Sequence, residues 1–207
     1  MLLSTPVFKR DPRCIPSHAC NQAGPFWRRP PILMSQRLAK SVQENMSSLP
    51  FAYFFQPNTV LVPVPKSSLM LKDTLWVPLR IATALARSGV GSQVDPCLVR
   101  ITPVRKAASS RASERPKPKD HFASLSVQPR ISGPPPNEIL LVDDMITRGS
   151  TLLGAANRLA EAFPGTRIRA FGAMTTISDR ADFVALSKPL IGSIQYRPST
   201  EDTIRRP

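Results

Sequence analysis

The 207-residue sequence is poor in cysteine, histidine, aromatic residues and acidic residues. Its three cysteines, Cys14, Cys20 and Cys97, are an odd and scattered set, which argues against a disulfide framework and indicates a reducing compartment. No Cys-x-x-Cys pair is present, so a zinc module has little support. No apolar run reaches the roughly 18 residues that a membrane-spanning helix needs. We therefore predict a cytoplasmic protein without a membrane segment.

Negative charge is scarce relative to positive charge. The chain has 28 Lys and Arg residues against 14 Asp and Glu residues, a formal net charge of +14. Residues 97–130 hold eight basic and two acidic residues, whereas residues 137–178 hold four of each. Such an excess predicts a polyanionic partner, either nucleic acid or a small phosphorylated ligand. The interleaved aromatic residues of a base-stacking surface are missing, but charge alone leaves both partners open.

Glycine is also scarce, with 9 residues against 23 prolines, so part of the chain should not be packed. Residues 1–31 are basic and rich in proline, and we predict a disordered tail there. Residues 32–178 are predicted to form one α/β domain, and residues 179–207 a C-terminal extension. The chain is too short for a multi-domain enzyme.

Apolar spacing predicts the elements of this domain. Helical spacing occurs over residues 32–48 and 73–87, and short apolar runs typical of strands occur over residues 59–65 and 97–101. Residues 102–120 are basic and rich in proline and serine, which predicts a long exposed loop. Residues 122–127 alternate weakly and predict an edge strand, followed by a linker turn at residues 133–136.

The segment Ile139–Thr151 reads ILLVDDMITRGST, an apolar strand, two carboxylates, a short polar loop and the start of a helix. The helix continues on an apolar stripe to Phe163, and residues 167–175 predict another strand. This completes a β-α-β unit, in which ligands bind at the carboxyl end of the parallel strand. The turn amides, the hydroxyls of Thr147, Ser150 and Thr151, and the helix dipole suit a phosphate there.

The two carboxylates of this segment are expected to contact a part of the ligand other than its phosphate. A phosphate would repel Asp143 and Asp144, so their partners should be hydroxyl groups of the same ligand or a divalent cation bridging to it. Hydroxyl groups beside a phosphate indicate a sugar phosphate.

ILLVDDMITRGST resembles, at every position class, the phosphoribosyl pyrophosphate (PRPP) signature of the type I phosphoribosyltransferases. The resemblance implies a Rossmann-like parallel sheet flanked by helices, with a long basic flexible loop. It implies that Asp143 and Asp144 hold the ribose hydroxyls and Mg²⁺. It also implies that the loop from Met145 to Thr151 binds the 5′-phosphate, through Met145, Ile146, Thr147, Arg148, Gly149, Ser150 and Thr151.

Residues 59–175 resemble the branch of this family that contains competence protein F and the amidophosphoribosyltransferase-like proteins. By this resemblance Lys66, after Val62–Pro65, contacts the pyrophosphate leaving group. The basic loop would supply further catalytic cations, Lys106, Arg111 and Arg115, of which Arg115 fits best. The branch's Arg-Gly-x-Asn-Gln element and four-cysteine zinc module are absent, so ribose phosphate binding is better supported than transfer.

The expected activity is transfer of a phosphoribosyl group from PRPP to a nitrogen acceptor with release of pyrophosphate, in a protein that forms a homodimer. The chain ends, residues 1–58 and 179–207, would form the hood that selects the acceptor, which the sequence does not identify. His121 is a candidate general base, although an isolated histidine near a turn is more often structural.

The sequence allows three alternatives to this activity. A non-catalytic PRPP-sensing regulator or a nucleic-acid-binding protein on the same fold is favoured by the net charge. A structural scaffold with an inactive pocket would not bind PRPP at all. A phosphorelay receiver domain is disfavoured, because the 64 residues after Asp143 are too few for its remaining strand-helix units.

Overall fold

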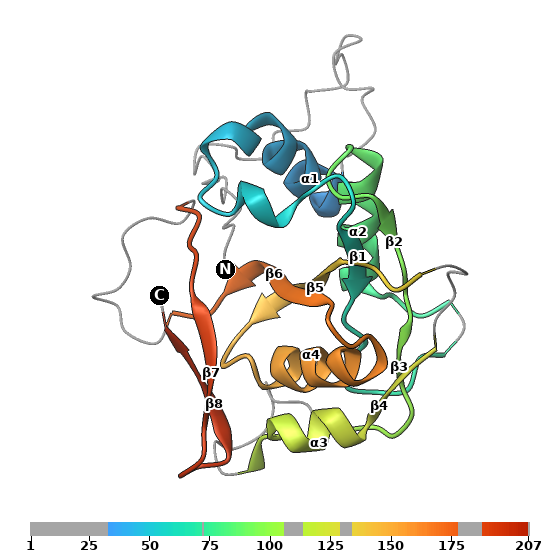
Figure 1. Ribbon diagram of the computed structural model, residues 1–207, viewed down its shortest axis with the longest axis vertical. Coiled ribbons are helices and arrows are strands. Elements are labelled where there is room, and N and C mark those ends of the chain that lie inside the picture. The colour runs from blue at the N-terminus through green and yellow to red at the C-terminus, as the bar shows by residue number, and fades with distance from the viewer. Residues whose placement is uncertain (1–32, 72, 106–113, 129–133, 178–187, 207) are drawn as a thin grey trace, which may run out of the picture.

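The computed structural model describes residues 33–71, 73–105, 114–128, 134–177 and 188–206 (Figure 1). The tail predicted over residues 1–31 lies outside these ranges. Within them, no helix is both long enough and apolar enough to cross a membrane.

Four parallel strands form the central sheet, in the order β2-β1-β5-β6. The strands are β1 (Val60–Pro63), β2 (Gln93–Val94), β5 (Glu138–Ile146) and β6 (Arg167–Thr175). Strand β5 lies between β1 and β6, so its carboxyl end is flanked by the carboxyl ends of two other parallel strands. The predicted α/β class, a parallel sheet flanked by helices, is confirmed.

Helices cover both faces of this sheet (Figure 1). Helices α1 (Met34–Glu44) and α2 (Val77–Arg87) pack on one face, and α4 (Ser150–Ala162) packs on the other. Leu140 and Val142 of β5 belong to the core beneath α1 and α2, whereas Ile139 and Leu141 belong to the core beneath α4. A strand buried on both faces needs apolar side chains at consecutive positions, which explains the unbroken apolar run in β5.

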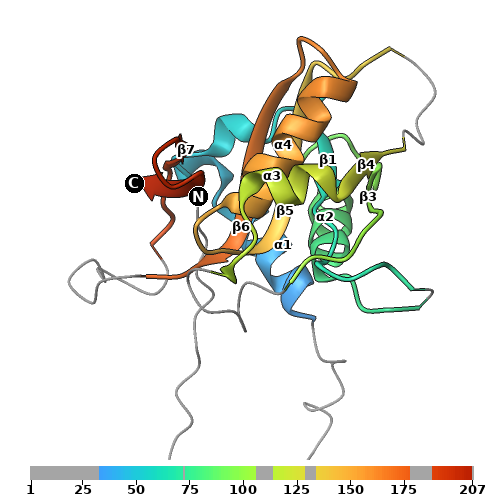
Figure 2. The same cartoon turned by 90° about the horizontal axis from the view of Figure 1, so that it is seen from below.

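Smaller elements surround this core. Strands β3 (Leu98–Arg100) and β4 (Leu125–Val127) pair antiparallel, and so do β7 (Ser193–Arg197) and β8 (Asp202–Arg206), which form a C-terminal hairpin. Helix α3 (Pro118–Ala123) lies along α4, as Figure 2 shows. Two short 3-10 helices, η2 (Met46–Ser48) and η3 (Ala52–Phe54), follow α1.

Several predicted boundaries are corrected by the structure. Helix α2 begins at Val77 rather than at residue 73, with Pro78 in its first turn, where the missing N–H costs nothing. Helix α3 begins inside the stretch predicted as an exposed loop, because the Asp120 carboxylate caps it by accepting from the Lys117 backbone N–H at 2.8 Å. The strand predicted over residues 122–127 is shorter in the structure, because α3 continues to Ala123 and β4 begins only at Leu125.

Candidate functional site

The turn between β5 and α4, here called the phosphate loop (Thr147–Thr151), forms at the carboxyl end of the central strand. Gly149 is the N-cap of α4 and has a left-handed backbone with φ of +90°, which glycine adopts at little cost. The first amides of a 13-residue helix therefore point toward the loop and carry the positive end of its dipole. This is the geometry expected of an anion site.

The start of the loop differs from the expectation. Met145 and Ile146 were predicted to lie in it, but both belong to β5 and pair with Met174 and Thr175 of β6. The Ile146 side chain is buried in the core beneath α4. The loop is therefore Thr147–Thr151, because the strand ladder continues two residues beyond the carboxylates.

Asp143 and Asp144 lie just before the loop and are half-buried. The Asp144 backbone N–H donates to Asp143 Oδ1 at 2.9 Å. Burial and the neighbouring Asp144 carboxylate together raise the pKa of Asp143 well above its usual value. No basic side chain of the described ranges forms an ion pair with either carboxylate, so their paired negative charge would be stabilised by a cation.

The oxygen atoms of these carboxylates are of the type that Mg²⁺ prefers. Two carboxylates are too few to fill its coordination shell, so other ligands would have to complete it. Mg²⁺ prefers oxygen ligands and is often held by one or two carboxylates together with water and substrate phosphates. The described residues contain no group of three or more His, Cys, Asp or Glu side chains that could hold a metal by themselves. The site therefore suits a cation that arrives with a phosphorylated ligand.

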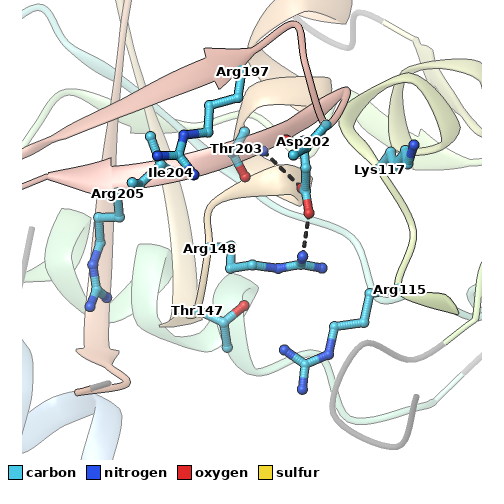
Figure 3. Close-up of a pocket in the computed structure, with 10 residues that line it drawn as sticks. Arg115, Lys117, Thr147, Arg148, Arg197, Asp202, Thr203, Ile204 and Arg205 are labelled. Atoms are coloured by element: carbon cyan, nitrogen blue, oxygen red, sulfur yellow. Dashed lines mark hydrogen bonds and ion pairs between the residues drawn. The ribbon is translucent and has the colours of Figure 1, made fainter. Parts of the chain in front are cut away.

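The C-terminal hairpin contacts the phosphate loop through Asp202. Its Oδ1 accepts from Ser150 Oγ at 2.8 Å. The same oxygen accepts from the Thr203 backbone N–H at 2.8 Å, and Oδ2 pairs with Arg148 (Figure 3). Ser150 Oγ also lies 2.9 Å from Thr203 Oγ1. The carboxylate of Asp202 thus occupies the place in which a helix N-terminus stabilises negative charge.

Ile194 of β7 closes the loop from the same side. A Cβ atom built on Gly149 would lie 2.6 Å from Ile194 Cδ1, so no larger residue fits there without displacing the hairpin. The cavity lined by the phosphate loop, Asp143 and His121 is about 30 Å³, enough for only one or two water molecules. A phosphate group needs more room than this cavity offers, and none of the described residues that line it belongs to the hairpin.

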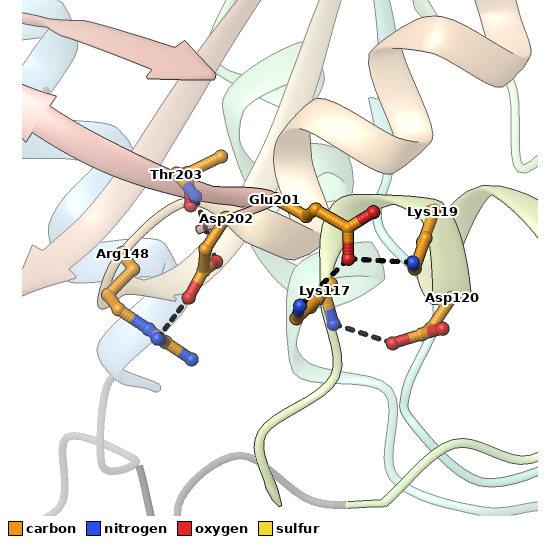
Figure 4. A network of polar contacts seen from close by, with 7 residues as sticks. All are labelled: Lys117, Lys119, Asp120, Arg148, Glu201, Asp202 and Thr203. Atoms are coloured by element: carbon orange, nitrogen blue, oxygen red, sulfur yellow. Dashed lines mark hydrogen bonds and ion pairs between the residues drawn. The ribbon is translucent and has the colours of Figure 1, made fainter. Parts of the chain in front are cut away.

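A second contact anchors the hairpin to α3. Glu201 Oε2 accepts from Lys117 Nζ at 3.0 Å and from Lys119 Nζ at 2.9 Å (Figure 4). The bond to Lys119, then that to Lys117, lowers the pKa of Glu201 to about 2. Since these groups are exposed, the pairs orient the hairpin more than they stabilise it.

His121 of α3 lies behind the loop, with 4% of its surface exposed. Its Nε2 is 3.3 Å from Thr151 Oγ1. Burial, aided by the Arg100 charge, lowers the pKa of His121 to about 4, so the ring is neutral near pH 7. We conclude that His121 supports the loop from within the protein.

The largest cavity beside the loop, here called the basic pocket, has a volume of about 600 Å³ (Figure 3). Its walls come from the loop, from the segment before α3 and from the hairpin. It is lined by Arg115, Lys117, Thr147, Arg148, Arg197, Thr200, Asp202, Thr203, Ile204 and Arg205.

The structure brings some of the predicted cations together and separates others. Arg115 lines the basic pocket beside Thr147 and Arg148. Lys66 lies at the same sheet edge, after β1, and its carbonyl accepts from Arg100 Nε at 2.9 Å, but its side chain does not line that pocket. The predicted catalytic residues Lys106 and Arg111 lie outside the described residues.

The hairpin residues of the site were not identified from the sequence. Asp202, Arg197 and Arg205 lie more than 45 positions from the loop they face, and no spacing rule connects them. The sequence signal available there was the turn-forming stretch Pro198–Thr200, which lies between two short segments. Its partner surface could not be read from the sequence.

No family model and no curated protein matches this sequence. Among solved structures, it is similar to hypoxanthine phosphoribosyltransferase from Staphylococcus aureus in tetragonal crystals, with 11% identity, a TM-score of 0.39, and coverage of 69% of this chain and 63% of that chain. The same enzyme in orthorhombic crystals is 11% identical with a TM-score of 0.37, and the match covers 72% of this chain and 69% of that chain. Hypoxanthine phosphoribosyltransferase from Trypanosoma cruzi is 16% identical with a TM-score of 0.34, and the match covers 69% of this chain and 63% of that chain. These identities and TM-scores are too low to assign a family.

Proposed function

We propose that this chain is a phosphoribosyltransferase-like protein that binds PRPP with Mg²⁺ and transfers its phosphoribosyl group to a nitrogen acceptor. The single observation that carries the proposal is the strand-turn-helix junction. There two carboxylates, a left-handed glycine and the N-terminus of α4 follow one another at the carboxyl end of β5. The proposal includes a cytoplasmic location, which is supported by the cysteine usage alone.

In this proposal each part of the junction takes one part of PRPP. The amides of the phosphate loop, with the hydroxyls of Thr147 and Thr151, bind the 5′-phosphate. Asp143 and Asp144 accept hydrogen bonds from the ribose hydroxyls. The same carboxylates would hold Mg²⁺, which would supply positive charge to stabilise the pyrophosphate leaving group.

Cationic side chains assist departure of the pyrophosphate. Lys66, at the end of β1, and Arg115, before α3, are the described candidates for contact with the leaving group. Cations aimed at developing negative charge lower the barrier to cleavage of the C1 bond. Arg100 is a positioning residue, because its buried guanidinium fixes the Lys66 carbonyl.

In this proposal the hairpin releases Ser150 and Arg148 of the loop when the 5′-phosphate binds. The carboxylate of Asp202 and the phosphate compete for Ser150, for Arg148 and for the helix N-terminus. The hairpin then has a second role besides covering the site, since it holds the loop in a preformed shape until the ligand arrives.

The experiment that tests the proposal is calorimetric titration with PRPP in the presence of Mg²⁺, followed by a screen of nitrogen acceptors for release of pyrophosphate. Saturable binding that needs Mg²⁺, with acceptor-dependent release, is the expected result. No binding of PRPP or of ribose 5-phosphate would overturn the proposal.

A second candidate is a non-catalytic regulator that senses PRPP and binds nucleic acid. The net charge of +14 and the cations of the basic pocket favour it. It predicts PRPP binding without release of pyrophosphate, together with nucleic-acid binding that weakens steeply as salt rises.

A further inference from the structure

We propose that the basic pocket is the acceptor subsite and that the acceptor carries a negative charge, most simply a carboxylate on its ring. The inference rests on the proposed function and names the substrate class of that site. It is carried by the position of the pocket, by its uncompensated charge and by the groups that are missing from its lining.

The basic pocket lies next to the proposed binding site of the sugar phosphate. Thr147 and Arg148 line both the basic pocket and the small cavity of the phosphate loop, so the two spaces share a wall. The opposite wall is the hairpin, on the β6 side of the sheet. Lys66, which follows β1 on the other side of β5, does not line the pocket. A molecule in the pocket therefore lies beside the proposed sugar phosphate site, on the side of Arg115 and not of Lys66.

The charge of the pocket lining is strongly unbalanced. Among the described lining residues, five are basic and one, Asp202, is acidic; Asp202 pairs with Arg148, and Lys117 pairs with Glu201 outside the lining. Arg205 donates to the main-chain carbonyls of Ile146 and Thr176, which leaves its charge uncompensated by any carboxylate of the described residues.

Arg197 is the most available of the five cations. It has no hydrogen bond or ion pair with another side chain of the described residues, and it reaches over the pocket from β7 (Figure 3). Its planar guanidinium suits a carboxylate, which it can bind through two parallel hydrogen bonds.

The remaining lining residues favour an anionic ligand over a neutral base. Two hydroxyl groups, those of Thr147 and Thr200, supply further donors for carboxylate oxygens, whereas the Thr203 hydroxyl already contacts Ser150 Oγ. Ile204 is the only large apolar residue among the described lining residues, and none of these has an aromatic ring on which an uncharged heterocycle would stack. A volume of about 600 Å³ accommodates a single ring with its substituent.

The test uses ring pairs that differ by one carboxylate. The full chain is first saturated with ribose 5-phosphate, which fills the sugar site but has no leaving group, and is then titrated with nicotinate or nicotinamide, and with orotate or uracil. Each carboxylate is expected to bind about 10-fold tighter than its neutral counterpart or more, because it gains charge-assisted hydrogen bonds. Equal affinities, or tighter binding of the neutral rings, would overturn the inference.

Matched variants locate the binding. Arg197→Gln should weaken nicotinate or orotate binding by about 10-fold while leaving ribose 5-phosphate binding within about two-fold. Arg206→Gln removes the same charge from an exposed residue of β8 that does not line the pocket, and should leave both unchanged. Equal effects of the two substitutions would show general attraction and refute the subsite.

Two further outcomes are distinguishable. If Arg197→Gln weakens PRPP binding but spares ribose 5-phosphate, the pocket holds the pyrophosphate and the inference is wrong although the proposed function stands. If neither sugar phosphate binds the parent protein, the proposed function itself fails, and the inference fails with it.

Discussion

The contact between Asp202 and the phosphate loop leads to a prediction in which stability and ligand affinity change in opposite directions. Asp202→Asn keeps the size of the side chain and one oxygen acceptor but removes its charge. The parent carboxylate accepts from Ser150 Oγ and the Thr203 N–H and pairs with Arg148. The Asp202 side chain is only 15% exposed, so solvent screens these contacts weakly.

The magnitude follows from these contacts. A hydrogen bond to a charged group contributes about 1.5–3 kcal/mol, and asparagine retains part of it, so we expect the free energy of unfolding to fall by about 1–2 kcal/mol. Removal of the competing carboxylate frees Arg148 and Ser150 for the phosphate and also removes a repulsion. We expect the affinity for ribose 5-phosphate to rise about 10-fold, equivalent to about 1.4 kcal/mol.

The assay pairs urea denaturation with calorimetric titration of ribose 5-phosphate. Glu201→Gln is the matched control, since it removes the neighbouring acid, which contacts Lys117 and Lys119 but not the loop. That change should raise the affinity by less than about two-fold, because the group is exposed. A fall in both stability and affinity in Asp202→Asn would refute the reasoning, since it would show that the hairpin contact builds the phosphate site rather than competing for it.

Three other predictions follow from the same site. Asp144→Asn should weaken Mg²⁺-dependent PRPP binding by about 10-fold or more, because it removes charge beside the ribose hydroxyls, and calorimetry showing unchanged affinity would contradict that role. Gly149→Ala should lower the free energy of unfolding by about 2 kcal/mol, through left-handed strain and the clash with Ile194. Gly165→Ala has the same strain with no atom within 4 Å, so denaturation curves should show a smaller loss. The lowered pKa of His121, about 4 against 6.5, makes the folded state favour the neutral ring, so its contribution is fully present above pH 6.5 and is lost as pH falls toward 4, by up to about 3 kcal/mol. Unfolding free energies of His121→Gln should lack this component, and an unchanged pH profile would count against the buried neutral ring.

Sequence patterns predicted the central part of the fold because burial there imposes a simple rule. Strand β5 is buried on both faces, so its apolar run was readable, and the helical stripe of α4 placed the loop between them. The confirmed features are local in the chain or repeat with a fixed period.

The features that were missed depend on long-range contacts. Helix α3 has only six residues, within a proline-rich and lysine-rich stretch, and it packs closely on α4 where Gly154 has no side chain. The continuation of β5 through Ile146 is set by pairing with β6. Strand β7 is largely exposed, β8 is mostly half-buried, and neither carries a clear periodicity, so their position over the loop depends on Ile194 and Asp202 rather than on a local pattern.

The position of the hairpin near the end of the described chain has a consequence for synthesis. Chains fold from the N-terminus as they leave the ribosome, so the sheet and α4 can form while β7 and β8 are still being made. During that interval the turn at Gly149 lacks both the Ile194 side chain and the Asp202 carboxylate. If the proposed function is correct, a newly made chain would therefore expose the turn to the small phosphorylated molecules around it before its own carboxylate reaches that turn.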